Sequence, residues 1–307
     1  MKKMKATRDF FGDYLLKLAK NNPKIVVVNC DLGEATRTLA FKDIYPERYI
    51  QAGIAEANAI SISAGLAKEG LIPFVTSFGH FLTGKFLEIF QSVGLNNSNV
   101  VMVGTHAGLA IGKDGPTQMG LRDIALMRTL PNVRIYHPIN PEQVAESLDE
   151  IVKVNGPKYL RLNRQPQEFF KLDNSINFGH GDLIFKGKDI LVISQGAPTI
   201  EAYHAIKNLN YESKIGLLCI SSMPINNDSY ASIVSQYNKL LIVEDHFEIG
   251  GIADLVSRLI SEKNINIEFN TINVSDYGQS GDPKDLYSRY NLDQKSIEKK
   301  LKKLLNE

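Results

Sequence analysis

The sequence predicts an α/β protein of two domains, each built on a mostly parallel sheet covered by helices. Its apolar runs, such as IVVVN at 25–29 and VVMV at 100–103, lack polar alternation, which is typical of strands buried on both faces. Between these runs lie segments with apolar residues at helical spacing, and alternating strands and helices form parallel sheets. The 307 residues are enough for about two domains with separate cores.

The first half of the chain alternates strands and helices without interruption. We expect strands at 24–33, 72–78, 99–108 and 132–138. We expect helices at 8–20, 57–66, 81–94, 122–131 and 140–154, of which the last opens with an Asn-Pro start signal. These elements predict a first domain over residues 1–168.

The periodicity lapses at 163–182, where polar and turn residues predominate. We therefore predict a linker at 169–180 and a second, smaller α/β domain at 181–307. Its expected strands are 189–196, 214–223, 239–246 and 267–275, and its expected helices are 199–209, one from about 229, 250–263 and 295–305. The last of these, KSIEKKLKKLL, is typical of a solvated amphipathic helix.

Composition excludes several classes of protein. The net charge of +1, from 35 basic and 34 acidic residues, gives no electrostatic case for binding nucleic acid or an anionic membrane. Cys30 and Cys219 lie in apolar runs, so they indicate no disulfide framework and suit a reducing compartment. No segment resembles a signal peptide or a membrane span. We therefore expect a cytoplasmic protein with no nucleic-acid or membrane partner.

Glu56 stands directly before a run of small and apolar residues, ANAISISAGL, with no charge until Lys68. A helix so poor in charge is normally covered on most sides, and an acid buried beside it is costly unless something pairs with it. One interpretation places Glu56 in the first helical turn, where a negative charge suits the helix dipole. The other makes it a functional acid whose partner is absent from the sequence.

In parallel α/β sheets, ligands bind where strands end and helices begin. Four such ends carry residues suited to binding or catalysis: Asp31, Glu56, the segment 78–81 with Phe78, His80 and Phe81, and the loop 104–120. This loop holds His106, Asp114 and five glycines, and loops of this length are more often functional than structural filler. No phosphate-binding glycine motif, nucleophile elbow or zinc-ligand spacing accompanies them, so we predict no metal ligands in this chain.

Four segments carry a resemblance to a known family. GIAEANAISISAGLAKEGLIPFVTSF at 53–78 and THAGLAIGKDGPTQMGLRDIALMRTLPNVRIYHP at 105–138 resemble the C-terminal half of transketolase, a thiamine-diphosphate enzyme. VEDHFEIGG at 243–251 and YGQSGDPKDLYSRYNL at 277–292 resemble that family's C-terminal domain. The likeness covers nearly the whole chain in the right order. It implies a pyrimidine-binding domain followed by the smaller C-terminal domain.

The resemblance implies how the cofactor is bound. Glu56 would reach nitrogen N1′ of the aminopyrimidine and share a proton with it. The ring would then favour its imino tautomer, whose 4′ nitrogen takes the proton from thiazolium C2. Phe78, Phe81 and Ile54 would contact the aminopyrimidine.

The resemblance also implies how the sugar is bound. Arg8, His106 and Arg164 match sugar-phosphate contacts, and His106 would take part in catalysis as well. Asp114 matches an aspartate that binds a sugar hydroxyl, while Asp31 matches a position near the subunit contact.

Two positions depart from the family pattern. Gln118 stands where the family has a histidine, and Ala35 stands near its phosphate-binding serine. Glutamine can hydrogen-bond a sugar hydroxyl, but it cannot carry charge or transfer a proton. These departures leave the sugar open, including a modified or unphosphorylated one.

The family binds the cofactor's pyrophosphate and Mg²⁺ through a Gly-Asp-Gly motif and an asparagine, in a domain N-terminal to the part seen here. This chain contains no Gly-Asp-Gly. We therefore expect the second subunit of a split transketolase, with Mg²⁺ ligated mainly by a partner chain that carries the pyrophosphate-binding domain. We expect a homodimer core within a heterotetramer.

Three alternatives remain: a 2-oxoacid dehydrogenase E1 β-type subunit, a deoxyxylulose-phosphate-synthase-like subunit, and an inactive regulatory paralogue. A lipoyl-carrier partner would indicate the first of these. The synthase is one long chain with a different loop. Gln118 and Ala35 favour the inactive paralogue, whereas Glu56 and the two phenylalanines argue against it.

Overall fold

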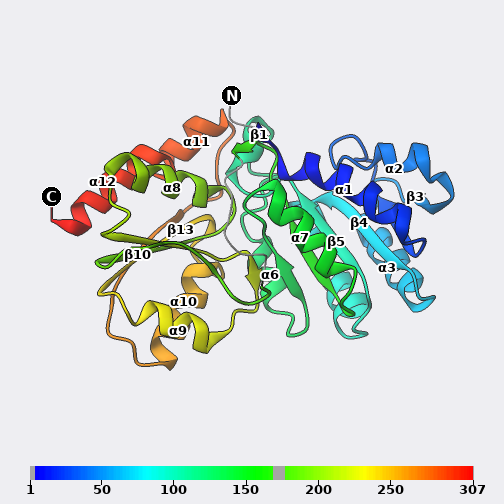
Figure 1. The fold of residues 1–307 in the computed structure, drawn as a ribbon. Coiled ribbons are helices and arrows are strands. Elements are labelled where there is room, and N and C mark those ends of the chain that lie inside the picture. The colour runs from blue at the N-terminus through cyan, green and yellow to red at the C-terminus, as the bar shows by residue number, and fades with distance from the viewer. Residues whose placement is uncertain (1–3, 169–176, 307) are drawn as a thin grey trace.

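The chain forms two α/β domains that lie side by side, each with a sheet between helices (Figure 1). The computed structural model describes residues 4–168 and 177–306. The predicted fold of two mostly parallel sheets covered by helices is confirmed. The boundaries at 1–168 and 181–307 stay predictions, and most of the predicted linker at 169–180 lies outside the described residues.

The first domain contains a parallel sheet in which neighbouring strands are far apart in sequence. The strand order is β12-β6-β7-β5-β4-β2-β3. Six of these strands pair in parallel: β2 (Ile25–Asn29), β3 (Tyr49–Gln51), β4 (Ile72–Phe78), β5 (Val101–Thr105), β6 (Arg134–Tyr136) and β7 (Lys158–Arg161). β2, β4 and β5 are buried along their whole length, as their unbroken apolar runs predict. A separate antiparallel pair joins β1 (Met4–Lys5) to β8 (Gln167–Glu168).

Helices cover both faces of this sheet. One face is covered by α1 (Thr7–Asn21), α2 (Leu39–Ile44) and α7 (Pro141–Ile151), whose first turn is capped by the Asn140 side chain. The other is covered by α3 (Glu56–Lys68), α4 (Gly79–Thr83), α5 (Phe86–Glu88) and α6 (Asp123–Arg128). Short 3₁₀ helices lie at Pro46–Arg48 and Leu109–Asp114.

One expectation for the first domain is wrong. The single helix predicted at 81–94 is instead α4, α5 and a π-helical turn at Ile89–Gly94, because the chain bends at Gly84 and Lys85. Within this chain α3 buries one face and exposes Asn58, Ser61 and Gly65.

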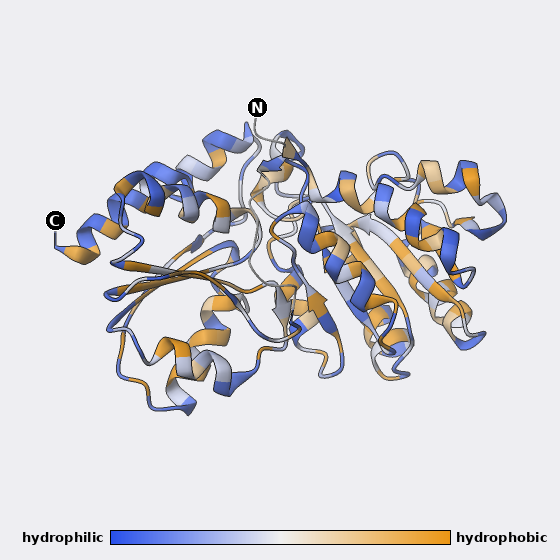
Figure 2. Cartoon of the chain, viewed as in Figure 1, coloured by the Kyte–Doolittle hydropathy of each residue, from blue (hydrophilic) through white to orange (hydrophobic). Residues whose placement is uncertain are grey.

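The second domain has a five-stranded sheet in the order β14-β13-β10-β11-β9. β10 (Ile190–Ser194), β11 (Ile215–Cys219), β13 (Lys239–Phe247) and β14 (Glu268–Val274) are parallel, and β9 (Asp182–Lys186) is an antiparallel edge strand. One face packs on α8 (Ala197–Leu209) and α12 (Gln294–Leu305), and the other on α9 (Asn227–Val234) and α10 (Ile252–Glu262). α11 (Pro283–Arg289) precedes α12. Figure 2 shows the apolar strands between helices that turn polar faces outward.

The two domains share a strand and a core. The strand predicted at 214–223 is divided, because β12 (Ser222–Met223) leaves the second sheet and pairs antiparallel with β6 of the first. One apolar cluster is continuous across the boundary, joining Val75 and Ile124 of the first domain to Ile193 and Val256 of the second. The second domain is therefore fixed against the first.

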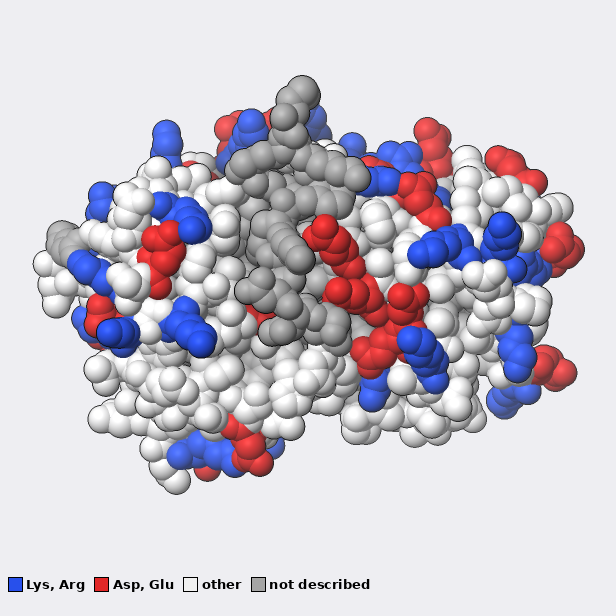
Figure 3. Space-filling model, viewed as in Figure 1, with Lys and Arg blue, Asp and Glu red and all other residues white. Residues whose placement is uncertain are grey.

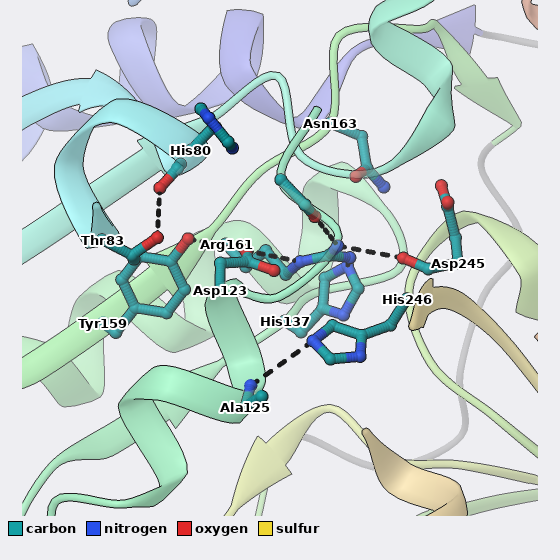
Figure 4. A network of polar contacts seen from close by, with 12 residues as sticks. His80, Thr83, Asp123, Ala125, His137, Tyr159, Arg161, Asn163, Asp245 and His246 are labelled. Atoms are coloured by element: carbon teal, nitrogen blue, oxygen red, sulfur yellow. Dashed lines mark hydrogen bonds and ion pairs between the residues drawn. The ribbon is translucent and has the colours of Figure 1, made fainter. Parts of the chain in front are cut away.

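Arg161, the last residue of β7, is a buried cation at this boundary (Figure 4). Its Nε donates to Oδ2 of Asp123 at 2.8 Å. Its Nη2 donates to the carbonyl oxygens of Gly120, at 2.9 Å, and of Asp245 in β13, at 3.0 Å. One guanidinium thus ties the first sheet to the second domain.

The Arg161–Asp123 pair remains ionised although it is buried. Burial alone would raise the pKa of Asp123, but the Arg161 charge and hydrogen bonds from Arg161 and Tyr159 hold that pKa below its ordinary value. The pKa of Arg161 is lowered by burial but raised by Asp123 and Asp245, and the net shift is upward.

Charged side chains of both signs are interspersed on the face shown in Figure 3, with acids gathered over α7. That helix carries Glu142, Glu146, Asp149 and Glu150. A mixed surface of this kind does not favour a polyanionic partner. Among the helices that the structure describes, none is both long and apolar enough to cross a bilayer.

We predict that Asp123→Asn lowers the free energy of unfolding by about 3–5 kcal/mol, because it leaves Arg161 buried without its counter-charge. Glu262→Gln removes the acid of a surface pair with Arg258, in which the side chains are 43% and 78% exposed, and should change stability little. Denaturant unfolding compares the two variants. Equal effects would show that the buried pair contributes no more than the surface pair.

Candidate functional site

The candidate site lies at the carboxyl edge of the first sheet. Strands β7, β5, β4 and β2 are neighbours and run in parallel, so the residues that follow them meet at one edge. Asp31 follows β2, Phe78 ends β4, His106 follows β5 and Arg164 follows β7. This arrangement brings together residues far apart in the sequence.

A cavity of about 440 Å³ opens at this edge. It is lined by Arg8, Asp31, Leu32, Glu34, Ala35, Arg37, Phe78, His106, Asp114 and Arg164. All the predicted sugar-binding residues except Gln118 are therefore in one cavity. Gln118 is half-buried on the turn after Gly115 and is not among the lining residues, so its contact with a sugar stays a prediction.

His106 is held as a neutral imidazole. Its Nε2 lies 2.7 Å from Nη1 of Arg8, and since an arginine can only donate, Nε2 accepts. Nδ1 then carries the hydrogen and donates to Oγ1 of Thr105 at 2.9 Å. Burial, followed by the charges of Arg8, Arg164 and Arg37, lowers the pKa of His106 to about 3. Both ring nitrogens are therefore engaged within the chain, and the imidazole does not hold a second proton near neutral pH.

Three arginines surround His106. Arg8 also donates to the carbonyl oxygen of Ala35 at 3.0 Å, whereas its buried Nε has no hydrogen-bond acceptor among the described residues. Arg164 pairs with Asp114 at 2.9 Å, and Arg37 pairs with Asp9 at 2.6 Å. The three arginines share the cavity lining with Asp31, Glu34 and Asp114, and Nε of Arg8 lies 3.7 Å from Oδ1 of Asp9. This mixture of donors and acceptors suits an oxygen-rich ligand.

Arg37 was missed by the sequence analysis. It lies in the loop after β2, where its φ of +63° is a conformation that side chains seldom adopt. Asp31 of the same loop has a φ of +61°. Backbone conformations of this kind cluster at binding sites. A sequence indicates a positive φ mainly through glycine, and because neither Asp31 nor Arg37 is a glycine, no signal in the sequence marks these positions.

Glu56 is a buried carboxylate at the start of α3, with 7% of its surface exposed. The hydroxyl of Ser77 donates to its Oε1 at 2.8 Å. In the part of the chain that the structure describes, Glu56 forms no ion pair. Its position in the first turn fits the helix-dipole interpretation. A buried acid with one neutral partner also fits a carboxylate that pairs with a group of a ligand or of another chain.

Cys30 lies near this carboxylate but stays protonated. Burial, and then the charge of Glu56, raise the pKa of the Cys30 thiol to about 12. The Cys30 thiol therefore carries no negative charge near neutral pH.

Aromatic rings stack at the end of β4, directly after Ser77, which donates the hydrogen bond to Glu56. Phe78 stacks on Phe81 with ring centres 5.5 Å apart and on His106 with ring centres 3.9 Å apart. Ile54, two residues before Glu56, is 86% exposed. Together with Glu56, these rings provide stacking surface and one acid, which suits a flat heteroaromatic ring with a basic nitrogen.

Comparison with known proteins gives the same two-domain division. A family model described as "Transketolase, pyrimidine binding domain" matches residues 3–167, and one described as "Transketolase, C-terminal domain" matches residues 179–297.

Three similar proteins differ in how much of their length this chain matches. A Methanocaldococcus jannaschii protein, provisionally named a transketolase C-terminal section, is 32% identical over 302 residues, which are 97% of this chain and 95% of that protein. Rattus norvegicus transketolase is 30% identical over 98% of this chain, but the match covers only 49% of the rat enzyme. A solved structure described as a split gene transketolase, inactive beta4 tetramer, is 31% identical, has a TM-score of 0.86, and is matched over 98% of both chains.

We predict that His106 stays neutral from pH 8 down to pH 5 in imidazole NMR spectra, because its pKa lies at about 3. Arg8→Met should raise this pKa but leave it below the ordinary value, since burial is the larger cause. The unfolded imidazole binds a proton near pH 6.5, so the neutral folded form loses stability as pH falls from there toward 3. Protonation of wild-type His106 near pH 6.5 would contradict this account.

Proposed function

Because this chain belongs to the transketolase family, as a pyrimidine-binding domain followed by a C-terminal domain, we propose that it is one subunit of a split, thiamine-diphosphate-dependent transketolase. A partner subunit would supply the pyrophosphate-binding domain. Together they would transfer a two-carbon ketol unit from a ketose to an aldose acceptor. The chain spans about half the length of rat transketolase and nearly all of the Methanocaldococcus jannaschii section, which supports a division of the enzyme between two chains.

The observation that carries the proposal is Glu56. It is a buried acid that forms no ion pair among the described residues and accepts a hydrogen bond from Ser77, the residue before Phe78, whose ring stacks on Phe81. Glu56 would share a proton with a ring nitrogen of the aminopyrimidine, and the rings would hold that heterocycle in place. When bound, the cofactor supplies the acidic thiazolium carbon at which the ketose carbon–carbon bond is broken.

Thiamine diphosphate fits this chain on its pyrimidine side only. Within residues 4–168 and 177–306, no group of three or more His, Cys, Asp or Glu is placed to hold a metal ion. We propose that the ligands of Mg²⁺ and of the pyrophosphate come mainly from the partner chain.

The cavity around His106 would bind the sugar. Arg8 and Arg164 would contact an anionic or hydroxyl-rich end, and Arg37 adds a third cation beside them. Neutral His106 would orient the Arg8 guanidinium through its Nε2, and Asp114 would accept a hydrogen bond from a sugar hydroxyl. Sugar phosphates and free sugars both satisfy this chemistry.

A homodimer core within a heterotetramer is the assembly we propose. The face of α3 that carries Asn58, Ser61 and Gly65 is exposed in this chain, and so is the apolar Ile54 next to the candidate site. We propose that another copy of this chain packs against this face. The solved relative described as an inactive beta4 tetramer supports self-association, and its inactivity is what a subunit without its partner should show.

We predict that the chain alone has no ketol-transfer activity and binds thiamine diphosphate with Mg²⁺ more weakly than micromolar, because it provides only the pyrimidine side of the site. Adding a partner chain that carries the Gly-Asp-Gly domain should restore both activity and tight binding. Isothermal titration and a ketol-transfer assay measure these effects. Micromolar or tighter binding by the chain alone would contradict a split enzyme.

A further inference from the structure

The loop at residues 106–121, here called the sugar loop, carries the candidate sugar-binding residues and rests on the second domain. Its beginning is held by Asp245 of β13, whose Oδ1 accepts a hydrogen bond from the backbone N–H of Leu109 at 2.8 Å. Its middle is held by the Ser280 hydroxyl, which donates to the carbonyl oxygen of Lys113 at 2.6 Å. Both of these contacts come from the C-terminal domain.

The end of the sugar loop is held in the same way. The backbone N–H of Phe247, two residues after Asp245, donates to the carbonyl oxygen of Leu121 at 2.8 Å. Arg161 donates to the carbonyl oxygen of Gly120 and, from the same nitrogen, to that of Asp245 (Figure 4). β13 is therefore in contact with both ends of the loop.

Of these contacts, the one from Asp245 joins a side chain of the second domain to the first turn of the loop. Its carboxylate is buried and also accepts a hydrogen bond from the Tyr287 hydroxyl at 3.0 Å. Gly108 lies against it, since a Cβ at that position would come within 2.1 Å of Asp245 Oδ2. With a φ of +77°, Gly108 needs to be glycine for its conformation as well as for this close approach.

The contact lies between the two residues that face the candidate site. Leu109 begins a 3₁₀ segment that is broken at Gly112, before Asp114. His106 is three residues earlier than Leu109 and has a φ of +57°, which side chains rarely adopt. An anchor at Leu109 therefore restricts the first turn of the loop and the imidazole next to it, whereas the Asp114 carboxylate, beyond the break, is also held by Arg164.

We propose that the C-terminal domain positions the sugar loop for substrate binding and that Asp245 is the positioning residue, acting through its hydrogen bond to the Leu109 amide. The identity of the substrate rests on the proposed function, whereas the placement of the loop does not. Asp245 touches neither cofactor nor sugar in this account, and its effect on them is transmitted by the loop.

Three variants separate this role from general stabilisation. Asp245→Ala removes the acceptor for Leu109. Asp245→Asn keeps an oxygen for Leu109 and presents an amide to Tyr287, whose hydroxyl can accept as well as donate. Tyr287→Phe removes the second bond to the carboxylate and leaves the Leu109 bond in place.

Hydrogen–deuterium exchange on the full chain is the first measurement. Amides at 107–114 should exchange faster in Asp245→Ala, while those of β2 should keep wild-type rates. Asp245→Asn and Tyr287→Phe should leave the loop close to wild type. Wild-type exchange of the loop in Asp245→Ala, or equal acceleration in Asp245→Asn and Asp245→Ala, would overturn the proposal.

Kinetics with the partner chain is the second measurement. Misplacement of the loop in Asp245→Ala should lower kcat/KM for the sugar roughly 10- to 100-fold, mainly through KM, while affinity for thiamine diphosphate stays unchanged. Asp245→Asn should restore most of the loss. An unchanged KM for the sugar, or an equal loss of cofactor affinity, would contradict a positioning role. If the wild-type pair shows no ketol transfer, the proposed function fails, and the exchange measurement still decides the role of Asp245.

Discussion

The buried ion pair of Arg161 and Asp123 is the interaction on which the rest of the structure depends. One guanidinium at the end of a central strand bonds to Asp123 in α6, to the end of the sugar loop and to β13 of the second domain. A buried charge of this kind is costly unless every donor has a partner, so the elements that supply those partners are constrained together. Uncharged contacts also join the two domains at this boundary, namely the pairing of β12 with the first sheet and the continuous apolar cluster.

The candidate site has the properties of one half of a binding site, because several of its polar groups lack a partner among the described residues. Glu56 is an acid without a cation, and Arg8 has a buried donor without an acceptor, in both cases among the described residues. His106 is a base kept unprotonated by burial and by three arginines. Groups left in these states inside a folded chain are costly, and a ligand that supplies the missing partners recovers that cost on binding. The aminopyrimidine at Glu56 and an oxygen-rich sugar end at Arg8 would do so, in line with the proposed split transketolase.

The sequence was sufficient where local pattern decides the structure. The apolar runs at 25–29 and 72–78 predict buried parallel strands, and parallel strands bring Phe78, His106 and Arg164 to one edge. Sequence reasoning failed where tertiary contacts decide. Ser222–Met223 forms a strand only because β6 lies beside it, and the single helix predicted at 81–94 is broken before the π-helical turn at Ile89–Gly94. Arg37 lines the cavity in a backbone conformation that no residue pattern predicts. Asp245 bonds to Leu109, which is 136 residues away in the sequence, so no local pattern indicates this contact.

The central claim is that this chain provides the carboxylate that activates a cofactor held mainly by another chain. Hydrogen–deuterium exchange at thiazolium C2, followed by NMR in the complex with the partner chain, tests it most directly. We predict that Glu56→Gln slows this exchange roughly 10²- to 10⁴-fold, the range for one acid–base group, while the exposed control Glu47→Gln exchanges like wild type. If Glu56→Gln exchanges C2 as fast as wild type, Glu56 does not act on the cofactor and is placed by the helix dipole alone.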